Sequence, residues 1–353
     1  MFNPIIQAHI KDNMPNALAE KRLTSSLLEM IYKEKWFNLW VPKAYGGMEY
    51  ALPEGCALLE ELAYEDGGLA WTVTLCAGAN MFAGFLEPAL AERIFTVREV
   101  CWGGSGRPSG KAEKTEAGYT LTGAWKYATG APHLTHFTLN AWLYEDGEPV
   151  LDAAGEPVYS SFFVDRDDVL IHYDWDTFGL EVTASHSFSI AGLTVAANRA
   201  FDLRPEQRKN NSALYYYPFM SFAACTLAVN YMGMFRKFME LYEKLLFQRS
   251  ADKKWQAEKG KELFMELDQV GQAFEAKKMA LYQLINSTWA QLSPAAEELE
   301  QLMFVSKEIV GFIREETSRL FPHTGILGAQ RENELNIVFR NIFTATQHAL
   351  LGC

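Results

Sequence analysis

The spacing of hydrophobic residues divides the chain of 353 residues into three zones. Residues 1–97 place apolar side chains three and four positions apart, the period of an amphipathic helix, as in PEGCALLEELAYED and EPALAERIF. Residues 98–204 change to short runs rich in Thr, Val and aromatic residues, separated by Gly, Asp and Pro, a pattern typical of antiparallel strands. From residue 205 to residue 353 the helical period returns in long segments. The order predicts an α+β protein, mostly α, with an N-terminal helical domain, a central antiparallel β-barrel and a C-terminal four-helix bundle.

One uncharged stretch, Gly67 to Leu86, is about long enough to cross a bilayer. Gly, Thr and Asn interrupt it, and acidic residues including Glu65 and Asp66 crowd one end. We therefore expect a buried helix of a globular protein and no membrane partner. The N-terminus shows no charged region followed by an apolar one, so no secretion signal is expected.

The charge balance and the cysteines limit the function classes. Asp and Glu outnumber Lys and Arg by 44 to 32, giving a net charge of -12, so binding of nucleic acid through a global basic field is not expected. The five cysteines are scattered without CxxC spacing, which predicts neither a disulfide framework nor a zinc site and indicates the cytoplasm: Cys56, Cys76, Cys101, Cys225 and Cys353. His133 and His136 stand three apart, but no third and fourth ligand is near in sequence, so no metal site is predicted.

Three stretches carry candidate chemistry. GYTLTGAWKYATG places Tyr127 two residues before Thr129 and a glycine, an aromatic surface beside a hydroxyl that suits a flat ring with polar edges. CWGGSGRPSG, which contains Ser105, could present backbone N–H groups to a phosphate or a flavin edge, although it matches no nucleotide-binding fingerprint. RNIFTATQH places Arg340 and His348 eight residues apart in what we expect to be the last helix.

Four separated stretches, in order, resemble the acyl-CoA dehydrogenase superfamily of flavoproteins. They are LWVPKAYGG with the following LLEELAYEDGGLAW, GYTLTGAWKYATGA, WDTFGLEVTASHSFSI, and HTGILGAQRENELNIVFRNIFTATQH. In the last stretch Gly325 and Gly328 stand 15 and 12 residues before Arg340, the spacing of the family's Gly pair and Arg. The resemblance covers nearly the whole chain.

The resemblance implies a flavin site and a homotetramer. Tyr127 would pack on the flavin ring, Thr129 would bond near its N5 and O4 edge, and Ser105 would lie in the first barrel loop. Gly325 and Gly328 would approach the adenine half of FAD, usually that of a neighbouring subunit, and Arg340 would also belong to the cofactor-binding residues. Arg249 is the nearest candidate for the family's pyrophosphate-binding Arg-x-x-Phe-Gly, but no Phe-Gly follows it, so FMN is a possible cofactor beside FAD.

The last helix departs from the dehydrogenases of the family, which place a Glu where this chain has His348. Arg-Asn followed at eight by His resembles the two-component flavin monooxygenases of the same superfamily. An imidazole with an ordinary pKa of about 6.5 can act as base and acid near neutral pH. The sequence also places Glu181 where relatives often carry Arg.

Three functions stay open from the sequence. The first is a monooxygenase that uses reduced flavin and O2 on a small aromatic or heterocyclic substrate, with His348 as acid/base and a flavin reductase as partner. The second is an acyl-CoA dehydrogenase with an atypical base, which passes electrons to an electron-transfer flavoprotein. The third is a non-catalytic flavin-binding assembly protein.

Overall fold

Helices cover the first part of the chain in the computed structural model, which describes residues 2–352. They are α1 (Pro4–Glu20), α2 (Ser25–Lys33), η1 (Trp36–Asn38), η2 (Lys43–Tyr45), α3 (Leu52–Glu65), α4 (Gly67–Asn80), η3 (Met81–Phe85) and α5 (Pro88–Phe95). Several of these helices follow a residue whose side chain accepts a hydrogen bond from a backbone N–H of the first turn. Asn3 does so for α1, Thr24 for α2 and Asp66 for α4. These caps mark the helix starts that periodicity alone left vague.

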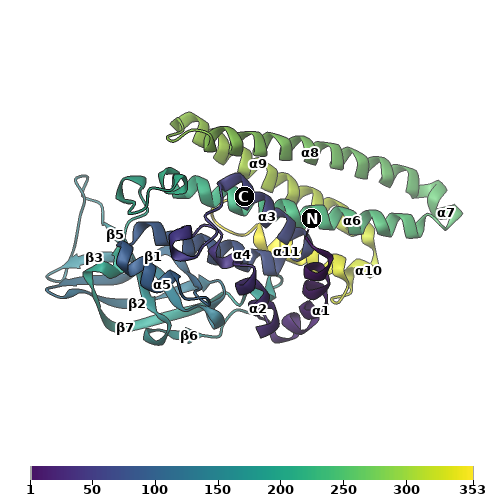
Figure 1. The fold of residues 1–353 in the computed structure, drawn as a ribbon. Coiled ribbons are helices and arrows are strands. Elements are labelled where there is room, and N and C mark those ends of the chain that lie inside the picture. The colour runs from purple at the N-terminus through teal and green to yellow at the C-terminus, as the bar shows by residue number, and fades with distance from the viewer. Residues whose placement is uncertain (1, 353) are drawn as a thin grey trace.

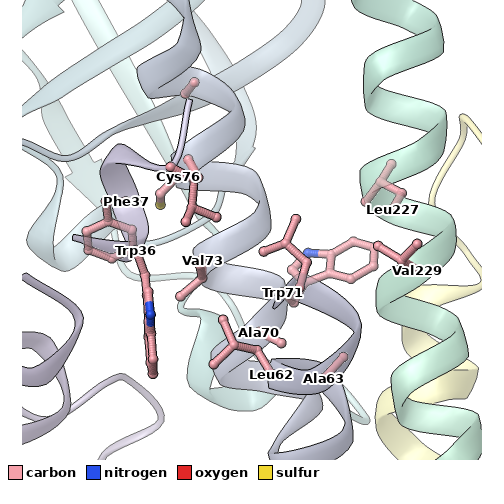
Figure 2. Packing of buried hydrophobic residues seen from close by; sticks show 14 of the residues in the cluster. Trp36, Phe37, Leu62, Ala63, Ala70, Trp71, Val73, Cys76, Leu227 and Val229 are labelled. Atoms are coloured by element: carbon pink, nitrogen blue, oxygen red, sulfur yellow. The ribbon is translucent and has the colours of Figure 1, made fainter. Parts of the chain in front are cut away.

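Helix α4 is buried on nearly all sides. The segment Gly67–Phe85 is long and apolar enough to cross a membrane, yet 89% of its most apolar window is buried inside the fold. Figure 2 shows Trp71 pointing from this helix toward Leu227 and Val229 of α6, while Phe37 and Cys76 lie on the other side. The predicted buried helix is confirmed, and it separates the helical bundle from the sheet.

The middle of the chain forms one eight-stranded sheet in the order β6-β7-β2-β1-β3-β5-β8, with β4 beside β3. The strands are β1 (Trp102–Thr115), β2 (Gly118–Ala128), β3 (His136–Glu145), β4 (Glu148–Pro149), β5 (Tyr159–Asp165), β6 (Leu170–His172), β7 (His186–Ala196) and β8 (Ala200–Phe201). All pairs are antiparallel except β1 with β3, which is parallel. The sheet therefore contains one pairing that a purely antiparallel barrel lacks.

The last part is a bundle of long helices on α6, at the opposite end of the molecule from the sheet (Figure 1). Its helices are α6 (Phe219–Arg249), α7 (Lys253–Trp255), α8 (Lys261–Trp289), α9 (Ala296–Leu320), α10 (Ile326–Ala329) and α11 (Glu334–Ala345). A buried carboxylate, Glu60 of α3, accepts from Arg236 of α6 and from Tyr282 of α8, which ties the N-terminal layer to the bundle. The predicted fold class is confirmed.

Strands lie between Trp102 and Phe201, and α6 begins at Phe219. The division into domains at residues 97 and 204 agrees with this order of elements but stays a prediction. Cys353 lies outside the described residues.

Candidate functional site

The end of strand β2 turns an aromatic ring outward. The pairing of β2 with β7 shifts register between Trp125 and Ala128, and Tyr127 in the shift has φ +67°. A non-glycine residue at positive φ is strained, so such positions often belong to functional sites. The Tyr127 side chain is 67% exposed, and its ring meets Trp175 edge-on at 6.2 Å between centroids.

Behind Tyr127 lies a buried group of hydroxyls. Thr129 Oγ1 is 2.9 Å from Ser185 Oγ, which is 2.8 Å from Thr183 Oγ1. The Thr183 hydroxyl donates to the carbonyl of Leu180 at 2.8 Å, so toward Ser185 the oxygen of Thr183 accepts. Thr129 is buried, so its hydroxyl supports the Tyr127 turn from within. Its predicted contact with the flavin edge stays a prediction.

An aromatic rim continues from Tyr127 across the loop between β6 and β7 to α11. We define it as Tyr127, Trp175, Phe178 and Phe343. Phe178 is 56% exposed and packs edge-on against Phe343 with centroids 5.9 Å apart. Exposed aromatic side chains in a row beside buried hydroxyls suit a flat, partly polar ring system.

Arg340 and Glu181 form a buried ion pair under this rim. Arg340 Nη1 is 2.7 Å from Glu181 Oε2, and the two side chains are only 6% and 13% exposed. The guanidinium also donates to the Phe178 carbonyl at 2.7 Å and, through Nε, to Asn336 Oδ1 at 2.9 Å. These partners hold the loop after β6 on α11. The cofactor role predicted for Arg340 stays a prediction, and in this structure its side chain serves the loop.

His348 lies beyond the last helix, not within it. Helix α11 ends at Ala345, because the chain then turns, and His348 follows in that turn. The expectation that the last helix includes His348 is therefore wrong. The His348 ring meets Trp71 of α4 edge-on at 5.7 Å, and Tyr231 of α6 packs on the other side of the contact, 5.7 Å from Trp71.

The His348 side chain is half-buried, and its Nε2 makes no hydrogen bond to residues 2–352. Burial lowers the pKa of His348 below its ordinary value of 6.5, so the ring is neutral at pH 7. Its Nδ1 accepts the backbone N–H of Leu350 at 3.3 Å, the one hydrogen bond made to the ring within residues 2–352. With Nδ1 accepting, the proton of the neutral ring is on Nε2.

Arg249, Gly325 and Gly328 come together at the other end of α11. Arg249 closes α6 and donates to the carbonyls of His323 and Thr324. Gly325 has φ +63°, and a Cβ on Gly328 would stand 1.8 Å from Thr324 Oγ1, so both positions require glycine. The predicted glycine pair thus allows a tight turn, and Arg249 braces the same turn.

Asn336 connects this turn to Arg340. It donates to the Gly328 carbonyl at 2.6 Å and accepts from Arg340 at 2.9 Å. The Arg340 guanidinium therefore links the glycine turn to the aromatic rim, which sequence spacing suggested only as a pattern.

We expected Ser105 in the first barrel loop. In the structure it lies in strand β1. It pairs with Leu139 of β3, directly before register shifts at Pro108 and Gly110. The Gly-rich composition is explained by packing, because a Cβ on Gly110 would stand 2.1 Å from the Trp125 ring and one on Gly104 1.8 Å from the Thr138 carbonyl oxygen. The predicted flavin contact of Ser105 stays a prediction.

The loop after β6 bonds to Thr129 through Ser185 and to Arg340 through Glu181, while His348 lies beside Trp71. Sequence reasoning missed Trp71, Tyr231 and Ser185. The signal for Ser185 was present in the Thr-Ala-Ser run of VTASHS, whereas no local pattern places Trp71 beside His348.

The comparisons with known proteins agree with the fold. Residues 1–95 match the family "Acyl-CoA dehydrogenase, N-terminal domain". Over 98% of this chain and 91% of its own, the HsaA monooxygenase from M. tuberculosis superposes with a TM-score of 0.90 at 17% identity. The chain has the acyl-CoA dehydrogenase fold. The resemblance predicted from four motifs is confirmed.

Two further proteins are similar to this chain. An indole-3-acetate monooxygenase of Acinetobacter baumannii is 23% identical over 341 residues, which cover 94% of this chain and 84% of the relative. XiaF from Streptomyces sp., in complex with FADH2 and glycerol, superposes with a TM-score of 0.86 at 20% identity, over 98% of this chain and 89% of its own. Both are similar to this acyl-CoA dehydrogenase-type chain over nearly its full length.

Proposed function

We propose that the protein is the oxygenase component of a flavin-dependent monooxygenase acting on a small aromatic or heterocyclic substrate. The observation that carries the proposal is the neutral His348, beside Trp71 and Tyr231, in a chain of acyl-CoA dehydrogenase fold that lacks the family's glutamate there. The full-length similarity to an indole-3-acetate monooxygenase supports the same reaction class. One oxygen atom of O2 goes to the substrate and the other leaves as water.

The residues around His348 suit an aromatic substrate. Trp71 packs edge-on against the imidazole, and Tyr231 packs edge-on against Trp71, so buried aromatic rings surround this side of His348. The Tyr231 hydroxyl donates to the carbonyl of Ala345 at 2.6 Å, which holds the end of α11 and thereby the turn that carries His348. As a base, His348 would accept the substrate's proton on Nδ1 in place of the Leu350 N–H, and as an acid it would donate a proton from Nε2.

A flavin fits the aromatic rim on the grounds of this structure. Tyr127 offers an exposed ring held at positive φ, and Phe178 adds a second exposed aromatic surface nearby. When bound, the flavin supplies two electrons and activates O2. The protein's part is to offer a flat face, to exclude water and to hold His348 in place. We propose FAD as the flavin, supplied in reduced form by a separate flavin reductase.

The test uses reduced flavin without any reductase. Purified protein with FADH2 prepared anaerobically is mixed with 18O2-saturated buffer and an indole or a phenol as probe substrate. We expect a product that contains one 18O atom, and a protein-dependent absorbance transient before the oxidised flavin band appears. Repeating the experiment with FMNH2 gives the flavin preference.

The same protein distinguishes the dehydrogenase. If oxidised flavin on the protein is bleached by an acyl-CoA thioester without O2, and no aromatic probe takes up 18O, the monooxygenase proposal is wrong. Absence of both reactions together with tight flavin binding would favour the assembly protein.

We also propose a homotetramer that works in the cytoplasm. Exposed apolar side chains on the outer helices of the bundle support self-association, since Met279 is 70% and Phe304 57% exposed. The four described cysteines are free and buried, as suits a reducing compartment. Light scattering of the wild type and of Met279→Lys/Phe304→Lys tests the assembly, and an unchanged mass in the variant would contradict this interface.

A further inference from the structure

Two sulfurs and one imidazole meet in the core, away from His348. They are Cys76 of α4, Cys101 directly before β1, and His133 of η4 (Ala131–His133), and their ligand atoms all lie within 4.8 Å of one another. Three different elements supply them. No local pattern predicts this cluster, because the two cysteines lie 25 positions apart and His133 lies 32 positions after Cys101.

The imidazole in this cluster has no partner. His133 Nε2 is buried and lacks a hydrogen bond to any residue between 2 and 352. Burial, with a smaller effect of the Arg166 charge, lowers the pKa of His133 to about 3, so the ring is neutral at physiological pH. A buried polar atom without a partner costs about 1–3 kcal/mol, and such atoms in native proteins call for an explanation.

The surroundings leave room for an ion only because residue 130 is glycine. Gly130 has φ +78°, and a Cβ there would stand 2.7 Å from His133 Nε2 and 3.2 Å from Cys76 Sγ. Phe37 closes one face of the cluster, stacked on the His133 ring at 5.9 Å and 14°, and lies beside Cys76 in Figure 2. The space between the ligand atoms is therefore small, apolar on one face and open toward Gly130.

We propose that Cys76, Cys101 and His133 bind a thiophilic closed-shell metal ion, Zn2+ or Cu+. Thiolate and imidazole are the ligands both ions prefer. Tetrahedral ligands at about 2.3 Å for sulfur and about 2.0 Å for nitrogen stand roughly 3.5–3.8 Å apart, so side chains within 4.8 Å need shift by only about 1 Å. Two thiolates neutralise Zn2+, and with the nearby Arg166 they also balance Cu+. Both thiols lose their protons to the buffer when the ion binds.

The ion would hold the turn behind Tyr127. The Cys76 thiol already donates to the Thr129 carbonyl at 3.7 Å, and Gly130 N–H donates to the Thr183 carbonyl at 2.8 Å. Binding would fix α4, the start of β1 and the turn after β2 to one another. The role is structural and independent of the proposed oxygenation.

The test titrates the full-length, untagged and fully reduced protein with Co2+ alone as a spectroscopic probe, and then with Zn2+ as competitor. We expect a thiolate-to-Co2+ absorption band that saturates at one equivalent and disappears on addition of Zn2+. In a separate arm, Cu+ is titrated against a chromophoric Cu+ chelator. The arm with the tighter binding identifies the ion.

The matched control is a second pair of buried cysteines that has no histidine beside it. Cys56→Ser/Cys225→Ser should keep the band, whereas Cys76→Ser/Cys101→Ser should lose it. Absence of binding in both arms, or a band that survives the Cys76/Cys101 change, overturns the proposal. If that variant does not fold, X-ray absorption of the Zn2+-loaded wild type decides, because a shell without two sulfurs overturns the site equally.

Discussion

The chemistry proposed for this protein depends on single side chains whose surroundings set their properties. His348 is neutral because it is half-buried, and its ring is oriented by a bond from Leu350 and by contact with Trp71. Tyr127 is exposed because a register shift forces its backbone to positive φ. In both cases the residue type was visible in the sequence, but the property that makes it useful comes from partners far along the chain.

Replacement of His348 by alanine should lower hydroxylation turnover by about 10²-fold or more, since proton transfer by a placed side chain contributes 10²–10⁴-fold. Flavin affinity should change little, because the imidazole packs on Trp71 and not on the aromatic rim. Single-turnover product formation and flavin titration measure the two effects. Gln347→Ala, at the exposed neighbour, is the control and should keep full turnover.

The pH dependence of turnover should carry the signature of a lowered imidazole pKa. Burial favours the neutral ring, so the active form persists as the pH falls through 6.5 and is lost only in more acidic buffer. Product formation should therefore be flat near neutrality and decline on an acid limb below the ordinary histidine value. If His348→Ala shows the same decline of product formation in acid, the decline belongs to another titrating group.

Tyr127→Ala should weaken binding of reduced flavin by roughly 2- to 10-fold, the value of one aromatic contact of about 0.5–1.5 kcal/mol. Thr129→Val combined with it should weaken binding further, because the hydroxyl chain to Ser185 is cut. Tyr159→Ala is the control, since this ring is 49% exposed on strand β5, away from the rim. An unchanged dissociation constant in the double variant means that the flavin does not bind at the end of β2.

At the scale of elements, contacts between segments decide what local patterns cannot. From its sequence, the segment CWGGSGRPSG could present backbone N–H groups to a phosphate or a flavin edge. In the structure its residues from Trp102 onward lie in β1, and the Trp125 ring and the Thr138 backbone leave no room for a Cβ at Gly110 and Gly104. The last helix was expected to reach His348, but the chain turns after Ala345. The loop after β6 gains its position from Arg340 of α11.

Loss of one partner of the Arg340–Glu181 pair should destabilise the fold by about 3–5 kcal/mol, because the other charge stays buried. Arg340→Met and Glu181→Gln should each lower the free energy of unfolding in denaturant titrations. Arg340→Met/Glu181→Leu should recover much of the loss. The exposed pair of Arg98 with Glu29 is the control, and Arg98→Ala should leave the free energy of unfolding nearly unchanged, because exposed ion pairs are screened by solvent. If changes at the Arg340–Glu181 and Arg98–Glu29 pairs lowered the free energy of unfolding equally, the stabilising role of the buried pair would be contradicted.

Across the whole molecule, periodicity was sufficient for the order of layers and insufficient for their assembly. The helical and strand-rich zones, the buried α4 and the superfamily resemblance were all predicted correctly, because each depends on patterns that are local in the sequence and follow one another along it. The β1–β3 parallel pairing, the meeting of Cys76 with His133 and the contact of Trp71 with His348 were not predicted, since each joins distant segments. Such contacts arise from packing of the whole fold.

The stability of the molecule should fall as pH rises through the titration of Asp66. Burial raises the pKa of Asp66 from 3.8 to about 6, while its carboxylate still caps α4 through the N–H of Leu69 at 2.8 Å. The native state therefore keeps a proton that the unfolded chain has lost. The resulting stabilisation is complete below pH 3.8 and is lost as pH rises through about 6.

Asp66→Asn keeps an N-cap residue and removes the titration. The free energy of unfolding of the wild type and of Asp66→Asn is measured in denaturant from pH 4 to pH 7.5. Over this range the value of the variant should rise relative to that of the wild type by up to about 3 kcal/mol, the equivalent of two pKa units. The other titrating groups are the same in both proteins, so their contribution to the pH dependence cancels in this difference. A difference that stays constant over the range would show that Asp66 titrates normally.

The Arg340–Glu181 pair also sets an order of events during protein synthesis. Arg340 follows Glu181 by 159 residues, so at a synthesis rate of roughly 5–20 residues per second its codon is read some 8 to 30 s later. Throughout that interval the carboxylate of Glu181 lacks its nearest ion-pair partner. The loop after β6 can therefore dock fully only once α11 has been synthesised.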